Sequence, residues 1–334
     1  MNIFFIIVIS IIATASFNCS ANEIKTLKGF TMGNNFKVTW SEENITADRM
    51  NELSNRINNK LKHISQSMST WNSNSELSKI NSGSQLNNIE LSPELAKVID
   101  SSLKLNQLTE GALDITVAPL IQLWGFGVSG IIENAPSDSE IETVKKLTGA
   151  EKITIKDRKL QRYHKDVSID LSAIAKGYAV DVIAAILEEN NIENYIVDIG
   201  GELKLKGNKS NKPWTVGIDK PFAYSSGQIE VIEPGNKGIA TSGNYRKYFE
   251  SNGKHYSHII NPITGKPVQH TVVSATVISD SCMKSDGLAT AFMVLPVNKS
   301  LEIANNNNLS IMIIEDKFGK LTTHYSNSFK QYIN

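Results

Sequence analysis

The sequence predicts an α+β fold in which mixed sheets pack against helices. Segments with strand-like alternation and segments with helical spacing follow one another along the 334 residues, without the regular strand–helix–strand rhythm of a parallel α/β fold. Hydrophobic residues make up 40% of the chain and charged residues 20%, which is an ordinary globular balance. This length supports one large domain, or two smaller domains that share an interface.

The N-terminus carries the pattern of an export signal. Residues 3–15 form an apolar run that is shorter than the roughly 20 residues needed to span a membrane. Small residues at Ala13-Thr14-Ala15 and at Cys19-Ser20-Ala21 permit cleavage. We therefore expect residues 1–21 to be a signal peptide and residues 22–334 to be the mature domain.

Cys19 leaves two alternatives open. It is either removed with the signal or carries a lipid at a lipoprotein cleavage site, although Asn18 is larger than the residue expected before such a cysteine. Cys282 is the other of the two cysteines, so the mature chain is expected to have no disulfide and to depend on its core for stability.

Local patterns predict the elements of the first half of the chain. Apolar and polar residues alternate over residues 36–40, which predicts a strand. Thr46 then caps a helix whose apolar face runs through residues 50–64. Residues 72–88 are rich in serine and asparagine and are expected to be a loop, whereas Ser92-Pro93-Glu94 predicts a new helix.

The second half is expected to alternate between helices and strands in the same irregular way. Helices are expected over residues 137–148, 173–190 and 283–295, and strands over residues 153–169, 195–205, 272–278 and 309–314, the last of which ends the series. Gly200-Gly201 divides residues 195–205 into a strand pair.

Residues 258–267, His-Ile-Ile-Asn-Pro-Ile-Thr-Gly-Lys-Pro, predict a rigid turn directly after a histidine. Prolines and a glycine restrict the backbone there. Such a turn can hold His258 in one orientation, as acid/base chemistry requires, whereas a histidine taken alone is more often structural.

Two classes of protein are disfavoured. The chain contains neither a Gly-x-Gly-x-x-Gly loop nor a Walker loop, so the common nucleotide-binding folds lack their signature. Lysine plus arginine equal aspartate plus glutamate at 34 each, and the resulting zero net charge argues against a nucleic-acid partner.

Short motifs follow one another in a distinctive order: Thr31-Met32-Gly33, Met68-Ser69-Thr70-Trp71, Gly111-Ala112-Leu113-Asp114-Ile115-Thr116, Asp170-Leu171-Ser172-Ala173-Ile174-Ala175-Lys176-Gly177-Tyr178, Asp198-Ile199-Gly200-Gly201-Glu202, Thr241-Ser242-Gly243-Asn244-Tyr245-Arg246 and Ser285-Asp286-Gly287-Leu288-Ala289-Thr290. In this order they resemble the ApbE family, the FAD:protein FMN transferases. The resemblance implies a T-fold-like arrangement with the FAD site between two subdomains.

The resemblance also implies the reaction and its partners. Family members transfer FMN from FAD to a threonine or serine hydroxyl of an acceptor protein, using Mg²⁺ and releasing AMP. Acceptors such as subunits of membrane redox complexes are expected. The implied location is the bacterial periplasm, either free or anchored to the inner membrane through Cys19.

Asp286 and Thr290 are candidate metal ligands. Four residues apart on a predicted helix, they share one face and offer carboxylate and hydroxyl oxygens, which Mg²⁺ accepts. Taken alone, a capping aspartate and a buried threonine explain the pair better. The resemblance makes both of them ligands and adds the backbone carbonyl of Ala173.

The resemblance further implies a set of FAD contacts. Lys176 follows Asp170 near a predicted helix N-terminus, where the helix dipole favours phosphate, although a solvated lysine is the alternative. Trp71 offers a flat stacking surface, with core packing as its alternative. The other implied contacts are Met32, Ala112, Leu113, Asp114, His258 and Ile260.

These residues predict a flavin transferase in which His258 takes the proton of the acceptor hydroxyl and Asp286 acts close to the phosphates. Two alternatives use the same site. One is an FAD pyrophosphatase, in which water replaces the acceptor hydroxyl, and the other is a flavin-binding lipoprotein without chemistry.

Overall fold

The structure is a computed structural model that describes residues 23–333, except residues 43–45, 129, 131, 210, 222–226, 245–247 and 252–253. The expected signal peptide, Cys19, Tyr245 and Arg246 lie outside the described residues. No helix within the described part of the chain is both long enough and apolar enough to cross a membrane.

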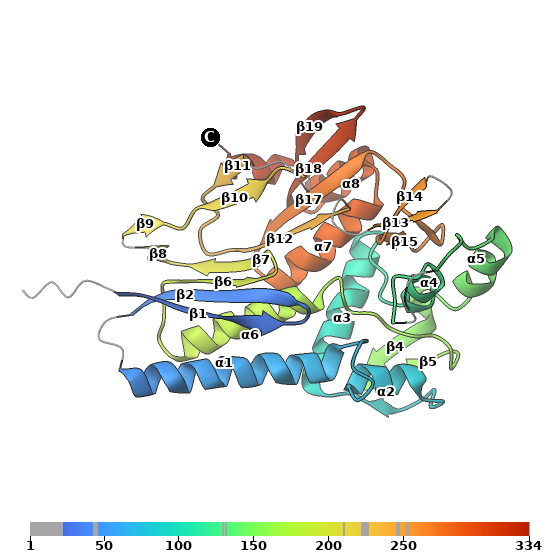
Figure 1. Ribbon diagram of the computed structural model, residues 1–334, viewed down its shortest axis with the longest axis horizontal. Helices are drawn as coiled ribbons and strands as arrows, with labels where there is room; N and C mark the ends of the chain where they lie inside the picture. The colour runs from blue at the N-terminus through green and yellow to red at the C-terminus, as the bar shows by residue number, and fades with distance from the viewer. Residues whose placement is uncertain are drawn as a thin grey trace, which may run out of the picture.

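An eight-stranded sheet forms the centre of the fold, in the order β1-β2-β6-β7-β12-β17-β18-β19 (Figure 1). The strands are β1 (Glu23–Thr31), β2 (Asn34–Glu42), β6 (Tyr195–Ile199), β7 (Glu202–Lys206), β12 (Gly238–Gly243), β17 (Val272–Ser279), β18 (Ser310–Lys317) and β19 (Lys320–Tyr325). Neighbouring strands of this sheet run antiparallel. The α+β class is confirmed, but this sheet is antiparallel, whereas the sequence had predicted a mixed one.

Helices cover one face of this sheet. They are α1 (Ala47–Met68), α3 (Pro93–Leu108), α6 (Ala175–Glu189), α7 (Cys282–Val294) and α8 (Val297–Asn306). Their apolar sides and alternate strand residues, such as Val38 and Val277, belong to one large buried cluster. The other strand residues, such as Ile239 and Ile278, belong to a second cluster with Trp214. Because strand side chains alternate between faces, the two clusters lie on opposite sides of the sheet.

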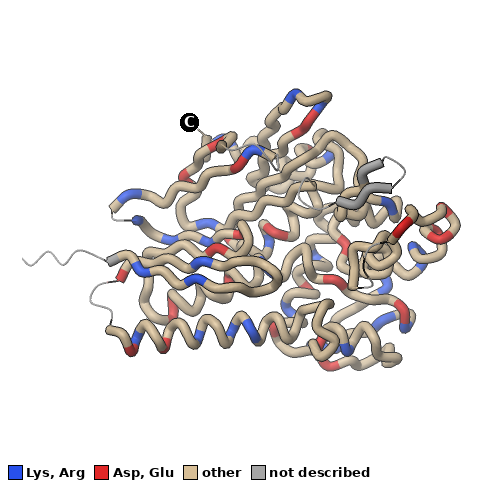
Figure 2. The backbone as a smooth tube through the Cα atoms, in the orientation of Figure 1, with Lys and Arg blue, Asp and Glu red and all other residues tan. Residues whose placement is uncertain are grey.

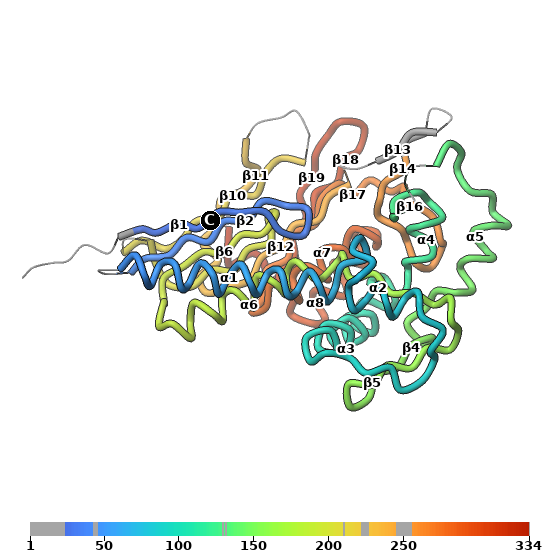
Figure 3. Tube along the Cα trace, turned by 60° about the horizontal axis from the view of Figure 1, so that its bottom comes forward, coloured from blue at the N-terminus to red at the C-terminus, as the bar shows by residue number. Residues whose placement is uncertain are grey.

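The second cluster is completed by β10 (Val216–Asp219), β11 (Gln228–Ile232) and the 3₁₀ segment η2 (Asn327–Tyr332). A third, smaller cluster joins α4 (Ala118–Leu123) and α5 (Asp138–Lys145) to Ile260. This cluster lies at the end of the molecule that is on the right of Figure 3. The same end contains four short strands: β13 (Tyr248–Ser251), β14 (Lys254–Ser257), β15 (Ile260–Asn261) and β16 (Lys266–Pro267).

The remaining elements are short. They are α2 (Glu76–Ser82), η1 (Ala150–Lys152), β3 (Ile89–Glu90), β4 (Ile153–Lys156), β5 (Lys159–Arg162), β8 (Asn208–Lys209) and β9 (Lys212–Pro213). Figure 2 shows acidic and basic residues interspersed over these and the larger elements.

The predicted helix starts are confirmed by their caps. The Thr46 hydroxyl accepts a hydrogen bond from the Arg49 N–H, and the Ser92 hydroxyl accepts one from the Leu95 N–H, at 3.2 and 3.3 Å. Ser137 opens α5 with a reciprocal capping box.

Three local predictions were wrong. Residues 72–88 contain α2, because the Ser75 hydroxyl caps a helix whose Leu77 and Ile80 are buried. Residues 309–314 do not form the last strand, since β19 follows. The strand predicted over residues 36–40 is not the first, since β1 precedes it and is joined to β2 by Met32-Gly33.

Candidate active site

A cavity of about 1540 Å³ is lined by every site residue predicted from the sequence: Met32, Trp71, Ala112, Leu113, Asp114, Asp170, Ala173, Lys176, His258, Ile260, Asp286 and Thr290. These residues come from elements spread over most of the chain. The fold therefore gathers into one place the motifs on which the resemblance rests. Their individual roles stay predictions, which the geometry below supports to different degrees.

Asp286 is positioned by unusually close packing of α6 against α7. A Cβ atom at Gly177 would lie 2.4 Å from the Cys282 carbonyl oxygen and 2.7 Å from Asp286 Cβ. Only glycine permits this approach. It brings the Gly177 N–H within 2.9 Å of Asp286 Oδ2, to which it donates a hydrogen bond.

Asp181 fixes the other end of this contact. From α6 it accepts hydrogen bonds from the N–H groups of Cys282 and Met283, at 2.8 and 3.0 Å, and from the Ser281 hydroxyl at 2.7 Å. These N–H groups belong to the first turn of α7, where a carboxylate satisfies free donors and opposes the helix dipole. Asp181 thus caps one helix from another and fixes the start of the turn that leads to Asp286.

Two buried carboxylates share one ammonium group in the cavity wall. Lys176 Nζ lies 2.9 Å from Glu202 Oε1 and 3.7 Å from Asp286 Oδ1. Asp286 is 2% exposed and Glu202 is 5% exposed. The second oxygen of Glu202, Oε2, is buried without a hydrogen-bond partner among the described residues.

Burial governs the protonation of this cluster. It raises the pKa of Glu202 to about 7 and raises the pKa of Asp286, while attraction to Lys176 opposes both shifts. Burial also disfavours the ammonium form of Lys176, but attraction to Asp286 and Glu202 outweighs it, and the pKa of Lys176 is raised. The lysine is therefore charged, and the carboxylates bind a proton more readily than exposed ones.

The oxygen donors in this part of the cavity fit Mg²⁺. Asp286 and Thr290 lie one turn apart on α7, and Thr290 Oγ1 is 3.3 Å from Ser242 Oγ on β12. No group of three or more histidine, cysteine, aspartate or glutamate side chains gathers within the described ranges. Mg²⁺ commonly takes few protein oxygens and fills its shell with water and phosphate. When both carboxylates are ionised, they and the lysine leave one net negative charge to attract Mg²⁺.

Asp170 lies in an irregular segment before α6. The sequence had instead predicted that a strand ends directly before it, at residue 169. The Asp170 N–H donates to the Ile115 carbonyl at 2.7 Å, and its Oδ1 accepts from the Ser172 N–H at 2.7 Å. The Asn81 side chain clamps the preceding residue, donating to the Ile169 carbonyl and accepting from the Ile169 N–H. Asp170 is thus held in place with its second carboxylate oxygen available to a ligand.

Ala112, Leu113 and Asp114 are buried in a pinned loop. Leu113 donates its N–H to the Thr109 hydroxyl at 3.1 Å. Asp114 accepts from the N–H and the hydroxyl of Thr116, at 2.8 and 2.6 Å, and burial raises the pKa of its carboxyl group. The Asp114 carboxylate already stabilises its own loop, so its contribution to ligand binding is shared with a structural role.

His258 lies in a bend between β14 and β15, and its ring stands edge-on to that of Phe126 at 6.4 Å between centroids. The predicted turn follows it. Asn261 Oδ1 accepts from the N–H groups of Ile263 and Thr264, at 2.9 and 3.2 Å, and Gly265 has a φ of 70°. The turn therefore closes on itself over residues 261–265, three to seven residues after His258.

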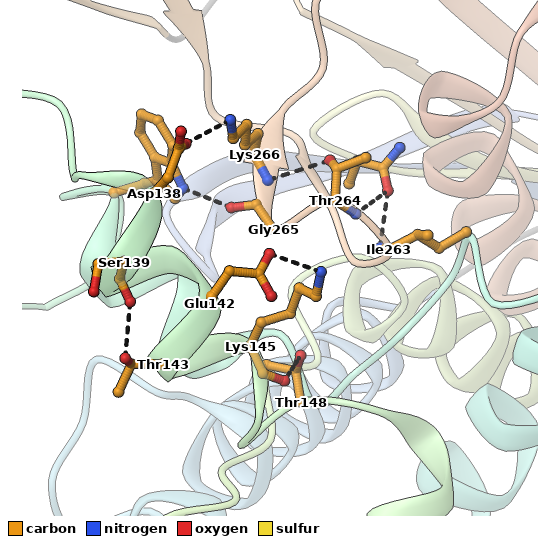
Figure 4. A network of polar contacts seen from close by, with 12 residues as sticks. Asp138, Ser139, Glu142, Thr143, Lys145, Thr148, Ile263, Thr264, Gly265 and Lys266 are labelled. Atoms are coloured by element: carbon orange, nitrogen blue, oxygen red, sulfur yellow. Dashed lines mark hydrogen bonds and ion pairs between the residues drawn. The ribbon is translucent and has the colours of Figure 1, made fainter.

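The same turn is tied to its surroundings (Figure 4). The Trp124 indole N–H donates to the Gly265 carbonyl at 2.8 Å, and Lys266 forms an ion pair with Asp138 of α5 at 2.7 Å. Ile260 is buried in the small cluster with Trp124. The segment that carries His258 is thus fixed by neighbours on both α4 and α5.

Trp71 and Met32 occupy different environments in the cavity wall. The Trp71 side chain is 72% exposed, so one large aromatic face is open to a ligand. Met32 and Gly33 have φ values of 49° and 74°, as a two-residue hairpin turn requires. The Asn34 amide donates to the Met32 carbonyl at 2.9 Å and stabilises this turn.

Sequence reasoning missed three residues that build the site: Glu202, Asp181 and Asn81. Glu202 was visible as an acidic residue directly after Gly200-Gly201, but nothing in the sequence pairs it with Lys176. Asp181 looked like an ordinary polar position on a helix, and Asn81 fell in a segment that was expected to be a loop.

A large cavity with a half-buried lysine, two buried carboxylates of raised pKa and a histidine directly before a rigid turn is characteristic of an enzyme active site. The fold and the cavity place the chain among α+β enzymes.

Comparisons with known proteins show to which family of enzymes the chain belongs. The ApbE family model matches residues 32–313, and the chain belongs to the ApbE family. A FAD:protein FMN transferase of Vibrio cholerae is 40% identical over 92% of each chain, and one of Haemophilus influenzae is 40% identical over 92% of this chain and 91% of its own. The chain is accordingly a transferase.

Comparison with solved structures supports the same family. The solved structure of the flavin transferase ApbE from Vibrio cholerae superposes with a TM-score of 0.87 at 39% identity, covering 93% of this chain and all of that one.

Proposed function

We propose that this enzyme transfers FMN from FAD to a threonine or serine hydroxyl of an acceptor protein and releases AMP, with Mg²⁺ bound at Ala173, Asp286 and Thr290. The single observation that carries the proposal is the convergence of all twelve predicted site residues on one cavity that contains a buried acidic pair. The names of the relatives supply the reaction, and the donor set of the cavity supports the metal.

The bond changes assign roles to the residues. The acceptor oxygen forms a bond to the FMN-side phosphorus, and the bond from that phosphorus to the AMP phosphate oxygen breaks, so that AMP leaves with the electron pair. His258 takes the hydroxyl proton, because its imidazole lines the cavity directly before a hydrogen-bonded turn. When bound, Mg²⁺ neutralises charge on the pyrophosphate.

The cavity has room for both substrates. Its volume of about 1540 Å³ exceeds the roughly 300–1,000 Å³ of common ligand pockets. Trp71 presents its exposed ring for stacking on FAD, while Lys176 and Asp170 lie next to the start of α6, where phosphate groups are favoured. An extended acceptor segment can then enter beside the bound dinucleotide.

The location and the acceptors are proposed from the N-terminal sequence and the family. We propose export to the periplasm with removal of residues 1–21 or lipid attachment at Cys19, and acceptors among the subunits of membrane redox complexes. Mass analysis of the protein purified from membranes and from periplasm distinguishes a lipidated Cys19 from a cleaved signal.

The test of the reaction compares AMP release with and without an acceptor domain. The protein is incubated with FAD and Mg²⁺, and AMP is quantified over time. Transfer predicts AMP release that depends on the acceptor. Rapid release of AMP and FMN without an acceptor would instead identify an FAD pyrophosphatase, and FAD binding without any AMP would identify a non-catalytic flavin-binding protein.

A further inference from the structure

We propose that Glu202 is a positioning residue that holds the Lys176 ammonium away from Asp286 and so leaves the Asp286 carboxylate free to bind a divalent cation. The inference rests on the proposed function, because it concerns the Mg²⁺ that this function requires. Neither the metal ligands nor the FAD contacts implied by the family resemblance include Glu202.

The unequal sharing of Lys176 is the first observation. Its Nζ atom is 2.9 Å from Glu202 Oε1 but 3.7 Å from Asp286 Oδ1. Coulomb attraction grows as distance falls, so each carboxylate competes for the same ammonium group. Glu202 holds the shorter contact, and the longer one leaves Asp286 Oδ1 without a close hydrogen bond from the lysine.

The anchoring of Glu202 is the second observation. Glu202 begins β7 directly after Gly200-Gly201, whose φ values are 65° and 103°, and the Gly201 N–H donates to Asp198 Oδ1 at 3.0 Å. Its neighbour Leu203 faces the second cluster, so Glu202 points to the opposite side of the sheet, where α6 and α7 pack (Figure 1). The sheet thus fixes Glu202, whereas Lys176 has a long, flexible side chain.

Loss of the Glu202 charge therefore has a definite consequence. The Lys176 side chain is only 23% exposed and keeps its charge, and Asp286 would become its remaining carboxylate partner within 4 Å among the described residues. The lysine then moves onto Asp286 Oδ1 and occupies an oxygen that the cation needs. Glu202 Oε2, buried and without a partner in the described part of the chain, suggests one rival role, which is direct binding of the cation.

The experiment titrates Mn²⁺ alone, as a probe for the Mg²⁺ site, into the mature protein and follows free Mn²⁺ by electron paramagnetic resonance. Glu202→Gln should weaken binding by about 10–100-fold, the usual effect of losing a residue that orients a metal ligand. Lys176→Gln should bind at least as tightly as wild type. In the Lys176→Gln background, Glu202→Gln should cause no further loss, because the lysine that it controls is gone.

Asp198→Asn is the matched control. It removes a carboxylate charge that also lines the cavity but has no ion pair with Lys176 among the described residues, and it should weaken Mn²⁺ binding much less than Glu202→Gln does. Thermal unfolding of each variant verifies that it is folded.

Three results would overturn the inference. The first is wild-type Mn²⁺ affinity in Glu202→Gln. The second is a loss that persists in the Lys176→Gln background, which would make Glu202 a direct ligand. The third is the absence of Mn²⁺ binding by the wild type, which would remove the proposed metal site as well but would leave flavin transfer to be judged by the acceptor assay.

Discussion

Gly177→Ala tests whether the contact between α6 and α7 positions Asp286. The added methyl group would lie 2.4 Å from the Cys282 carbonyl oxygen, whereas ordinary contact begins at 3.4 Å, so the two helices must separate locally by about 1 Å. Overpacking of this kind costs about 1–3 kcal/mol, and the higher helix propensity of alanine returns about 0.5–1 kcal/mol. We expect a net loss of about 1–2 kcal/mol in the free energy of unfolding.

The expected effect on turnover is larger than the effect on stability. The same displacement lengthens the hydrogen bond from the residue 177 N–H to Asp286, and a misplacement of about 1 Å at a reacting centre can cost about 100-fold in rate. The assay measures FMN transfer to an acceptor domain beside the thermal unfolding midpoint. Near-normal transfer by a folded Gly177→Ala variant would refute the claim that this contact positions Asp286.

Gly287→Ala is the matched control on α7. A methyl group there would meet the ends of the Leu105 and Leu113 side chains, at 2.7 and 3.2 Å, and not the backbone. The ends of these side chains can shift by a few tenths of an ångström. Because Leu113 is itself a predicted FAD contact, the two variants are compared at saturating FAD, where Gly287→Ala should retain much more activity than Gly177→Ala.

Three further predictions concern the residues of the site. Asp286→Asn should nearly abolish transfer and weaken Mn²⁺ binding while the fold persists, since the amide oxygen can still accept the Gly177 N–H; calorimetric metal titration beside the transfer assay measures both. His258→Ala should lower transfer by about 10²–10⁴-fold with FAD binding and the unfolding midpoint unchanged, because the turn is held by Asn261; equal transfer rates would assign the base elsewhere. Because the pKa of Glu202 is raised, the folded protein binds a proton at this carboxylate more tightly than the unfolded chain does. The stability of the metal-free protein should therefore fall as pH rises from 4.5 to about 7. Thermal unfolding across this range should show a smaller fall for Glu202→Gln than for the wild type.

Local chemistry explains which elements the sequence could predict. Thr46, Ser92 and Ser137 each predict the start of a helix, because a capping side chain accepts a hydrogen bond from an N–H group only three residues further along the chain. The seven-residue α2 was not predicted because its many serines and asparagines resemble a loop and hide the capping role of Ser75. Burial of Leu77 and Ile80 against the core adds the stabilisation that so short a helix needs.

The residues of the site likewise fall into those that local motifs predict and those that only the fold brings together. The motifs identified residues such as Trp71 and Asp286, which all reach one cavity. The pairing of Lys176 with Glu202, and the capping of α7 by Asp181, depend on how a strand and two helices meet. Such contacts join residues that are distant in sequence and carry no local pattern, so a single sequence could not reveal them.

The most direct test of the account is the mass of an acceptor domain after incubation with this protein, FAD and Mg²⁺. The account predicts that the acceptor gains the mass of one FMN moiety, located by fragmentation on a threonine or serine, with one AMP released for each modified acceptor. An acceptor of unchanged mass in the presence of released AMP and FMN would contradict transfer.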